Sequence, residues 1–136
     1  MNDQTLNAKG FVDTSSPMMP ALHKKVGEAK VKAVQEWVDE HYAEDFSLSW
    51  LAEQYAMSPR TLIRRFKTAT GESPLAYLQT VRIEVAKKYL EISAQTIAEI
   101  TQRVGYEDVS SFSKMFKRKV GLSPREYRGR FSKSAI

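Results

Sequence analysis

The feature that most constrains this chain is a pattern that it contains twice. "FKTATGESPLAY" begins at Phe66, and "FKRKVGLSPREY" begins at Phe116. Both segments read Phe-Lys, three residues, Gly, one residue, Ser-Pro, two residues, Tyr. Gly is a typical residue just after a helix end, and Ser-Pro is a typical start, with Ser as N-cap and Pro in the first helical position. Each copy therefore predicts the end of one helix and the beginning of the next.

The repeat also extends toward the N-terminus of each copy. Two short helical periods precede each Gly, and they are separated by tight turns at 56–58 and 105–108. The matched positions are Leu48, Leu51, Ala52, Tyr55 and Ala56 in the first copy and Ile97, Ile100, Thr101, Val104 and Gly105 in the second. A helix, a short turn and a second helix describe the helix-turn-helix motif. Two copies are too few for a solenoid, so we predict an all-α chain with two helix-turn-helix subdomains.

Cap signals and helical periods divide the rest of the chain, and no segment shows a strand pattern. Residues 1–23 have no period and are predicted to be a flexible tail or linker. A first subdomain is expected over 24–73, opening with a helix over 24–43. A long helix over 74–91 is apolar on two sides and is expected to link the halves. The second subdomain then covers 92–136, and Thr96 with Glu99 forms a predicted capping box.

Composition excludes several classes of protein. The chain has no cysteine, which excludes disulfides and thiolate metal sites and fits a reducing cytoplasm. We find no secretory signal at the N-terminus and no apolar run of membrane-spanning length, so no membrane partner is expected. The net charge of +5 and the pI of about 9.5 favour a polyanionic partner if the cations are clustered.

The cations are clustered on the second helix of each motif. In the first copy Leu62, Phe66 and Ala69 are expected to point inward; the opposite stripe is Arg60, Ile63, Arg64 and Lys67, flanked by Arg65. In the second copy Phe112, Phe116 and Val120 are expected to point inward; the opposite stripe is Ser110, Ser113, Lys114 and Lys117, flanked by Arg118 and Lys119. Neither helix contains an acidic residue. A helix face that is only exposed to solvent would carry both acidic and basic residues. Two basic faces without any acidic residue therefore predict binding to nucleic acid.

The same stripes carry side chains that can read bases. Arg60 and Arg64 can each donate two hydrogen bonds to guanine, and Ile63 can contact a thymine methyl group. Val109 can do the same in the second copy, while Ser110 and Ser111 can bond to almost any base edge. The second helix is therefore expected to be less selective.

These residues resemble the AraC/XylS family of bacterial transcription regulators. The resemblance covers residues 31–131 and is carried by "LAEQYAMSPRTLIRRFKTATGESP" and "IAEITQRVGYEDVSSFSKMFKRKVGLSPREYR". It implies two homeodomain-like three-helix units joined by a long linker helix, a promoter in double-stranded DNA as the target, RNA polymerase as a further partner, and no cofactor. The base-contacting positions that it implies are Arg60, Ile63, Arg64, Val109, Ser110, Ser111 and Lys114. Phosphate contacts are expected from Ser58, Arg65, Lys67, Ser113, Lys117, Arg118, Lys119 and Arg128.

The chain also departs from the family pattern. Thr101 stands where the family usually has Ala, so its hydroxyl must find a backbone carbonyl. Most members carry a separate sensor or dimerisation domain, and "SSPMMPALHK" is similar to the junction after a glutamine-amidotransferase-like sensor in one branch. The chain is therefore expected to be part of a longer regulator.

Other functions remain as alternatives. The main rival is a basic helical protein-interaction module, which would need a large exposed apolar patch. An enzyme is disfavoured, because His23 and His41 are the only histidines and no catalytic or metal-binding motif is present. RNA binding lacks an aromatic stacking platform, and binding to anionic membrane lacks exposed apolar residues opposite the cations.

Overall fold

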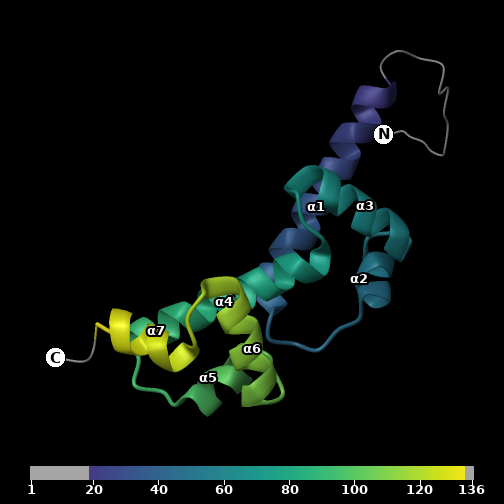
Figure 1. The fold of residues 1–136 in the computed structure, drawn as a ribbon. Helices are drawn as coiled ribbons and strands as arrows, with labels where there is room; N and C mark the ends of the chain where they lie inside the picture. Colours follow the sequence, from purple (N-terminus) through teal and green to yellow (C-terminus); the bar gives the residue numbers. More distant parts are fainter. Residues whose placement is uncertain (1–18, 134–136) are drawn as a thin grey trace.

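The computed structural model describes residues 19–133 and contains seven α-helices over that range (Figure 1). These are α1 (Met19–His41), α2 (Leu48–Gln54), α3 (Pro59–Thr70), α4 (Pro74–Ile92), α5 (Ile97–Arg103), α6 (Val109–Val120) and α7 (Pro124–Phe131). No strand occurs in the described range, which confirms the all-α prediction. None of the described helices combines the length and apolar character needed to cross a membrane.

The predicted tail is tested only at its end. Residues 1–18, which include the first four residues of the predicted sensor junction, lie outside the described residues, as do 134–136. Within the described part, α1 already begins at Met19, earlier than the start expected at residue 24.

The helices form two units with separate cores, connected by α4 (Figure 1). The first core is built from α1, α2, α3 and the start of α4: Val31, Val34, Val38, Leu51, Ala52, Met57, Leu62, Phe66 and Leu78. The second is built from the rest of α4 with α5, α6 and α7: Ile83, Ala86, Leu90, Ile100, Val104, Phe112, Phe116 and Tyr127. Tyr42, at the end of α1, packs against both.

The α4 helix shares its apolar residues between the two cores. Leu78 near its N-terminus enters the first core, whereas Ile83 and Leu90 enter the second. Leu75, expected on one of the apolar sides, is 61% exposed. The prediction is therefore wrong for Leu75, while the apolar sides of α4 do contact two different cores.

The structural repeat is larger than the sequence pattern suggested, because α1 and α4 are equivalent. The buried residues Val31, Val34 and Val38 of α1 match Ile83, Ala86 and Leu90 of α4 at a constant offset in the chain. Thus α1–α2–α3 and α4–α5–α6 are the two three-helix units. The linker helix is also the first helix of the second unit.

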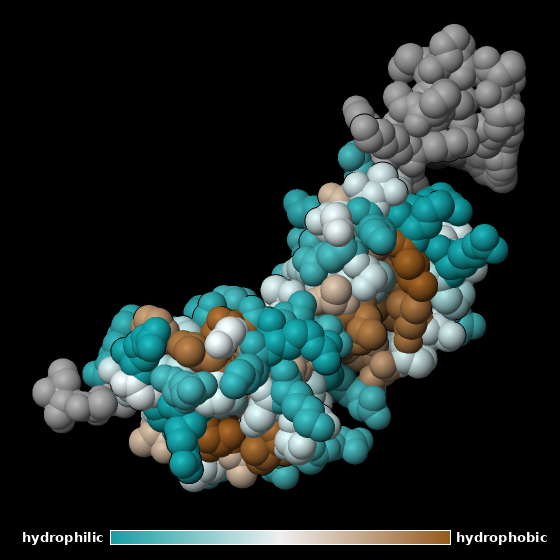
Figure 2. Space-filling model, in the orientation of Figure 1, coloured by the Kyte–Doolittle hydropathy of each residue, from teal (hydrophilic) through white to brown (hydrophobic). Residues whose placement is uncertain are grey.

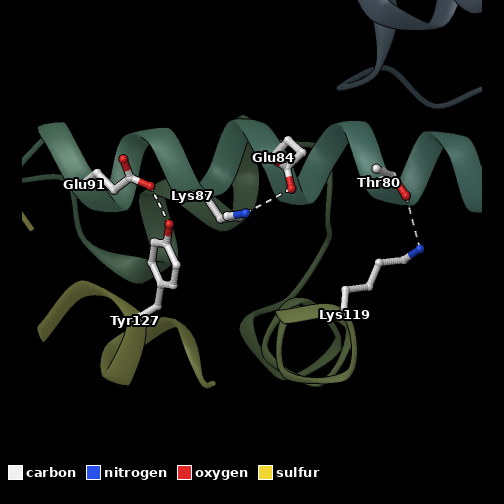
Figure 3. A network of polar contacts seen from close by, with 6 residues as sticks. All are labelled: Thr80, Glu84, Lys87, Glu91, Lys119 and Tyr127. Atoms are coloured by element: carbon white, nitrogen blue, oxygen red, sulfur yellow. Dashed lines mark hydrogen bonds and ion pairs between the residues drawn. The ribbon is translucent and has the colours of Figure 1, made fainter. Parts of the chain in front are cut away.

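A tyrosine closes each unit in the same way. Tyr77 packs edge-on against Phe66, and Tyr127 packs edge-on against Phe116, with ring centroids 5.5 Å apart in both pairs. The Tyr77 hydroxyl donates a hydrogen bond of 2.6 Å to Asp39 on α1. The Tyr127 hydroxyl donates to Glu91 on α4 (Figure 3). The repeated Tyr of the sequence pattern therefore ties the helix after each motif to the first helix of its unit.

The predicted helix caps at the Ser-Pro and Gly positions, and at Thr96, are confirmed. The side chains of Ser58, Ser73 and Ser123 accept the hydrogen bond of an N-cap, each before a Pro, and Thr96 forms a full capping box with Glu99. Gly71 and Gly121 follow α3 and α6 in the left-handed conformation, with φ of 86° and 91°.

The two helix-turn-helix turns share one backbone geometry. Ala56 and Gly105 both have positive φ, 55° and 100°. The next amide in each turn bonds back to a buried position of the first helix: Met57 N–H to the carbonyl of Ala52 and Tyr106 N–H to that of Thr101, both at 3.0 Å. The Thr101 hydroxyl donates to the Ile97 carbonyl at 2.7 Å, as its burial required.

Candidate nucleic-acid interface

The α3 helix is anchored on one side and open on the other. Leu62 and Phe66 are fully buried. The opposite stripe, here called the α3 face, consists of Arg60, Ile63, Arg64 and Lys67, all exposed. Ile63 is 39% exposed, so an apolar side chain lies in the open among cations.

One inward prediction on α3 is wrong. Ala69 is exposed, and Thr70 is the partly buried residue at this end of the helix. The reason is the helical period, which brings the residue four places after Phe66 over the core. The Thr70 hydroxyl donates a hydrogen bond to the Phe66 carbonyl at 2.8 Å and accepts one from the Glu72 amide. These two bonds stabilise the C-terminal end of α3.

The α6 helix has the same arrangement. Phe112 and Phe116 are fully buried, and Val120 is partly buried. The opposite stripe, here called the α6 face, consists of Val109, Ser110, Ser113, Lys114 and Lys117. All are exposed except the half-buried Ser113, and Val109 is 41% exposed. Arg118 and Lys119 lie beside this face and are exposed.

No ion pair joins a cation of either face to an acidic side chain in the described part of the chain, although Lys114 and Lys117 lie within electrostatic range of Asp108 and Glu126. The two ion pairs recorded there, His41 with Glu44 and Lys87 with Glu84, involve neither face. Many acidic residues lie instead on α1 and the loop after it, so the chain separates its charges in space. Unpaired cations on a helix face attract a polyanion without first having to break an internal ion pair.

Two predicted contact hydroxyls are occupied by helix capping. The Ser58 hydroxyl donates to Thr61 Oγ1 at 2.9 Å and accepts from the Thr61 amide. The Ser111 hydroxyl donates to Asp108 at 3.1 Å, and the Ser111 amide donates to the same carboxylate at 2.7 Å. These bonds from Ser111 lower the pKa of Asp108, so the cap stays ionised. Ser58 caps the start of α3, and Ser111 lies in the first turn of α6. The hydroxyl proton of each serine already has an acceptor, Thr61 Oγ1 for Ser58 and the Asp108 carboxylate for Ser111.

Two of the predicted phosphate contacts, Arg65 and Lys119, lie against other helices of the protein. Arg65 is half-buried and lies beside Gly27 of α1, where an added Cβ would be 3.5 Å from Arg65 Cδ. Lys119 donates to the Thr80 hydroxyl on α4 at 3.2 Å (Figure 3). Lys119 remains exposed, and its bond to α4 is one that a phosphate could replace.

Arg128 has a structural role that the sequence did not indicate. Its guanidinium donates to the Gln95 carbonyl at 2.6 Å and to the Ser93 carbonyl at 3.2 Å, with a further bond of 3.3 Å to Leu90. These carbonyls lie at the C-terminus of α4 and just after it, where backbone acceptors have no intrahelical donor. The prediction of a phosphate contact is therefore withdrawn for Arg128, because its donors already cap α4.

Arg82 is the residue of this region that sequence reasoning missed. It lies on α4 between the two cores and donates to backbone carbonyls of Tyr42 and Glu44. The signal was present in the sequence as a lone cation in the apolar stretch "VRIEVA".

Comparison with known proteins identifies the fold that carries these faces. A family model described as a helix-turn-helix domain, of the AraC type, matches residues 51–130. The chain belongs to the AraC/XylS family. The match begins within α2 and includes the rest of the first motif, the whole of α4 and the second motif, and it confirms that this chain carries the DNA-binding domain of that family.

Individual AraC/XylS relatives agree with this assignment. The chain is 38% identical over 101 residues to the HTH-type transcriptional activator RhaS of Salmonella schwarzengrund, a match that covers 74% of this chain and 36% of RhaS. The chain thus spans about a third of the length of the curated relatives that it matches.

Solved structures show the same two-unit architecture. The C-terminal domain of AraT, a response regulator from Geobacillus stearothermophilus, is 32% identical with a TM-score of 0.75; the match covers 79% of this chain and 89% of AraT's. The DNA-binding domain of AdpA, a global transcriptional factor solved with its target DNA, is 36% identical with a TM-score of 0.71; that match covers 74% of this chain and 91% of AdpA's. The predicted fold of two linked helix-turn-helix units is confirmed.

Proposed function

We propose that this chain binds double-stranded DNA in a sequence-specific manner, as part of a bacterial transcription regulator. The observation that carries the proposal is the pair of acid-free exposed faces on α3 and α6, each held by two buried anchors. Structural likeness to the DNA-binding domain of AdpA supports the same conclusion.

The two faces are proposed to enter successive major grooves of one duplex. The α4 helix has 19 residues, which makes it about 28 Å long at 1.5 Å per residue. Successive major grooves on one side of a duplex are about 34 Å apart, a separation that a helix of this length with a unit at each end can bridge. One chain would then read two unlike half-sites, so the target need not be a palindrome.

Each face is assigned both base and phosphate contacts. In the first groove Arg60, Ile63 and Arg64 would contact bases, and Lys67 would contact phosphate. In the second groove Val109, Ser110 and Lys114 would contact bases, and a second set would contact phosphates: Ser113, Lys117, Arg118 and Lys119. The remaining predicted contacts lie at the edges of the two faces and would support DNA binding there. Ser58 and Ser111 stabilise the starts of α3 and α6, and Arg65 lies on the flank of the α3 face.

A protein-interaction module is the second candidate, and the surface favours it less. The large apolar side chains that are exposed come from five different helices: Trp50, Ile63, Leu75, Ile92, Val109 and Phe131. Figure 2 shows hydrophobic surface in separate areas over the two units, broken up by hydrophilic residues. An interface of standard size needs a continuous contact area instead.

The wider assignments follow from the same proposal. We place the protein in the cytoplasm at the nucleoid, with promoter DNA and RNA polymerase as partners and without a catalytic role. An upstream sensor or dimerisation domain would supply the signal to which the complete regulator responds.

The test is selection of bound duplexes from a random pool, followed by fluorescence anisotropy titration at two salt concentrations. A selected duplex should bind far more tightly than a scrambled one, typically by 10³-fold or more. The logarithm of the affinity should fall linearly with the logarithm of the salt concentration, with a slope of about −0.9 per phosphate neutralised. Failure to enrich any sequence would refute sequence-specific binding, and preference for single strands, RNA or anionic vesicles would assign the faces to another partner.

A further inference from the structure

One side chain, Arg82, contacts both units at the place where they meet. Arg82 leaves α4 between Leu78, the last α4 residue of the first core, and Ile83, the first of the second. Its Nε donates to the Tyr42 carbonyl at 2.6 Å, and an Nη donates to the Glu44 carbonyl at 3.2 Å. Both carbonyls belong to the turn that follows α1. Arg82 therefore ties α4 to the end of the first helix of the first unit.

The other side of the same guanidinium contacts the second unit. Its central carbon lies 5.3 Å from the ring centroid of Tyr106, in the turn between α5 and α6. The Tyr106 ring packs in turn on Phe112, an anchor of α6, with centroids 5.7 Å apart. A chain of contacts thus runs from the backbone of the first unit through Arg82 and Tyr106 to Phe112, near the N-terminus of α6.

The neighbouring glycine shows how close the units come. Gly105 has φ of 100°, and a Cβ added to it would lie 3.0 Å from the Ala43 Cα and 3.0 Å from the Arg82 guanidinium. The motif turn of the second unit therefore sits directly against the turn after α1. We call this set the junction: Tyr42, Ala43, Glu44, Arg82, Gly105 and Tyr106.

A rigid guanidinium suits this position because its donors form a planar fork while its faces stack on rings. Arg82 is half-buried, and burial lowers its pKa. The protein thus keeps a partly desolvated cation at the place where the two units meet, beside Tyr42, which packs against both cores.

We propose that Arg82 fixes the orientation of α6 relative to α3, and thereby sets the spacing between the two DNA half-sites that the chain accepts. The proposal rests on the proposed function, since it requires both faces to bind one duplex. Arg82 is a positioning residue here: it acts through the junction and contacts no base.

The spacing of half-sites provides a sensitive readout. One added base pair moves a half-site by about 3.4 Å along the duplex and turns it by roughly 35°. A rigid junction cannot follow both changes, whereas a loosened one can. A merely stabilising residue would lower the affinity for every spacing by the same factor.

The experiment measures the affinity of the chain for labelled duplexes that carry the selected target with zero, one, two or five base pairs inserted between the half-sites. The wild-type chain should lose at least about tenfold in affinity with one inserted base pair. Arg82→Met keeps a long apolar side chain but has no donors, and its loss for the same insertion should be less than about threefold. A duplex with only the α3 half-site should bind both proteins equally.

A matched control separates the junction from general effects. Arg103→Met removes another arginine that stacks on a tyrosine, Tyr89, at 4.9 Å, but this pair lies within the second unit. Arg103→Met should discriminate between spacings as the wild type does.

A second measurement does not depend on DNA. The chain has no cysteine, so spin labels can be placed uniquely at Gln54→Cys on α2 and Gln102→Cys on α5, both exposed positions. The distance distribution between the labels should be narrow in the wild type and clearly broader with Arg82→Met. If Arg82→Met does not fold, Arg82→Lys keeps the charge without the fork and should show an intermediate broadening.

The outcomes are distinct. If Arg82→Met keeps both the wild-type spacing profile and the narrow distance distribution, Arg82 does not set the spacing and the proposal is wrong. If the wild type itself binds its selected duplex without regard to spacing, then only one face reads DNA. That result overturns the placement in successive grooves and this proposal together.

Discussion

Tyr77 on α4 donates a hydrogen bond of 2.6 Å to the carboxylate of Asp39 on α1, and Tyr127 on α7 makes the same kind of bond to Glu91 on α4. In both cases burial acts first, and the hydrogen bond and negative charge of the carboxylate add to it. Together they raise the pKa of each tyrosine from 10.0 to about 12. The folded protein therefore favours the protonated phenol more strongly than the unfolded chain does.

This relationship predicts how stability depends on alkaline pH. A group whose pKa is raised on folding contributes its full stabilisation below the unfolded-state value of 10.0 and loses it as the pH rises toward about 12. The free energy of unfolding, measured in urea, should fall across that window. The Tyr77→Phe and Tyr127→Phe double variant should be less stable at neutral pH, by about 1 kcal/mol per hydrogen bond, and its fall should be shallower. Parallel curves for the two proteins would contradict this prediction.

The two motif turns predict substitutions with opposite effects. Ala56 holds φ of 55°, a conformation that costs a residue with a Cβ about 1–2 kcal/mol. Ala56→Gly should stabilise the protein by up to about 1 kcal/mol, after the greater flexibility of glycine in the unfolded chain is subtracted. Thermal and urea unfolding measure this change. Gly105→Ala is the converse, and it should destabilise the protein because its Cβ would press on Ala43 and Arg82. A loss of stability in Ala56→Gly would show that the turn is unstrained.

Arg64 and Lys117 predict different kinds of binding defect. Arg64→Ala should weaken binding to the selected duplex by about 1–3 kcal/mol, with relaxed discrimination at one base pair and little effect on random DNA. Lys117→Ala should weaken binding to all duplexes alike and reduce the salt slope by about 1. Anisotropy titrations on selected and random duplexes distinguish them. Equal losses on both duplexes for Arg64→Ala would remove its base-reading role.

Arg128 should affect folding rather than DNA binding. Arg128→Ala leaves carbonyls at the C-terminus of α4 without donors, so it should lower the free energy of unfolding by about 2–4 kcal/mol. Arg128→Lys should recover little of this, because one ammonium cannot reach acceptors spread over Leu90, Ser93 and Gln95. The slope of log DNA affinity against log salt concentration should be unchanged for the folded Arg128→Ala protein. A slope reduced by about 1 would show that Arg128 does contact a phosphate.

Features with local causes were predictable from the sequence. The helix starts at Ser58-Pro59, Ser73-Pro74 and Ser123-Pro124 depend on a few adjacent residues, and so do the helix ends at Gly71 and Gly121. The exposed cations on α3 and α6 followed from the helical period alone. These are short-range effects, which a repeated pattern makes easy to detect.

Features that depend on distant contacts were not predictable. The equivalence of α1 and α4 is hidden because Val34 and Ala86, like their neighbours, share only apolar character, which any amphipathic helix has. The charge of Arg128 was evident, but its acceptors come from a segment more than thirty residues away in the chain. Sequence alone does not show where a long, flexible side chain ends, and Arg82 was missed for the same reason.

The continuity of α4 through both cores has a consequence for how such a protein can change. Because each residue of an α-helix adds about 1.5 Å and 100°, one residue inserted between Leu78 and Ile83 would turn the second unit by more than a quarter of a revolution. The length of α4 between the two cores thus sets the rotation of one unit relative to the other in steps of whole residues, and insertions or deletions in this segment disrupt it. The DNA target can therefore change through replacement of exposed side chains on the α3 face and the α6 face, while the length of α4 has to stay constant.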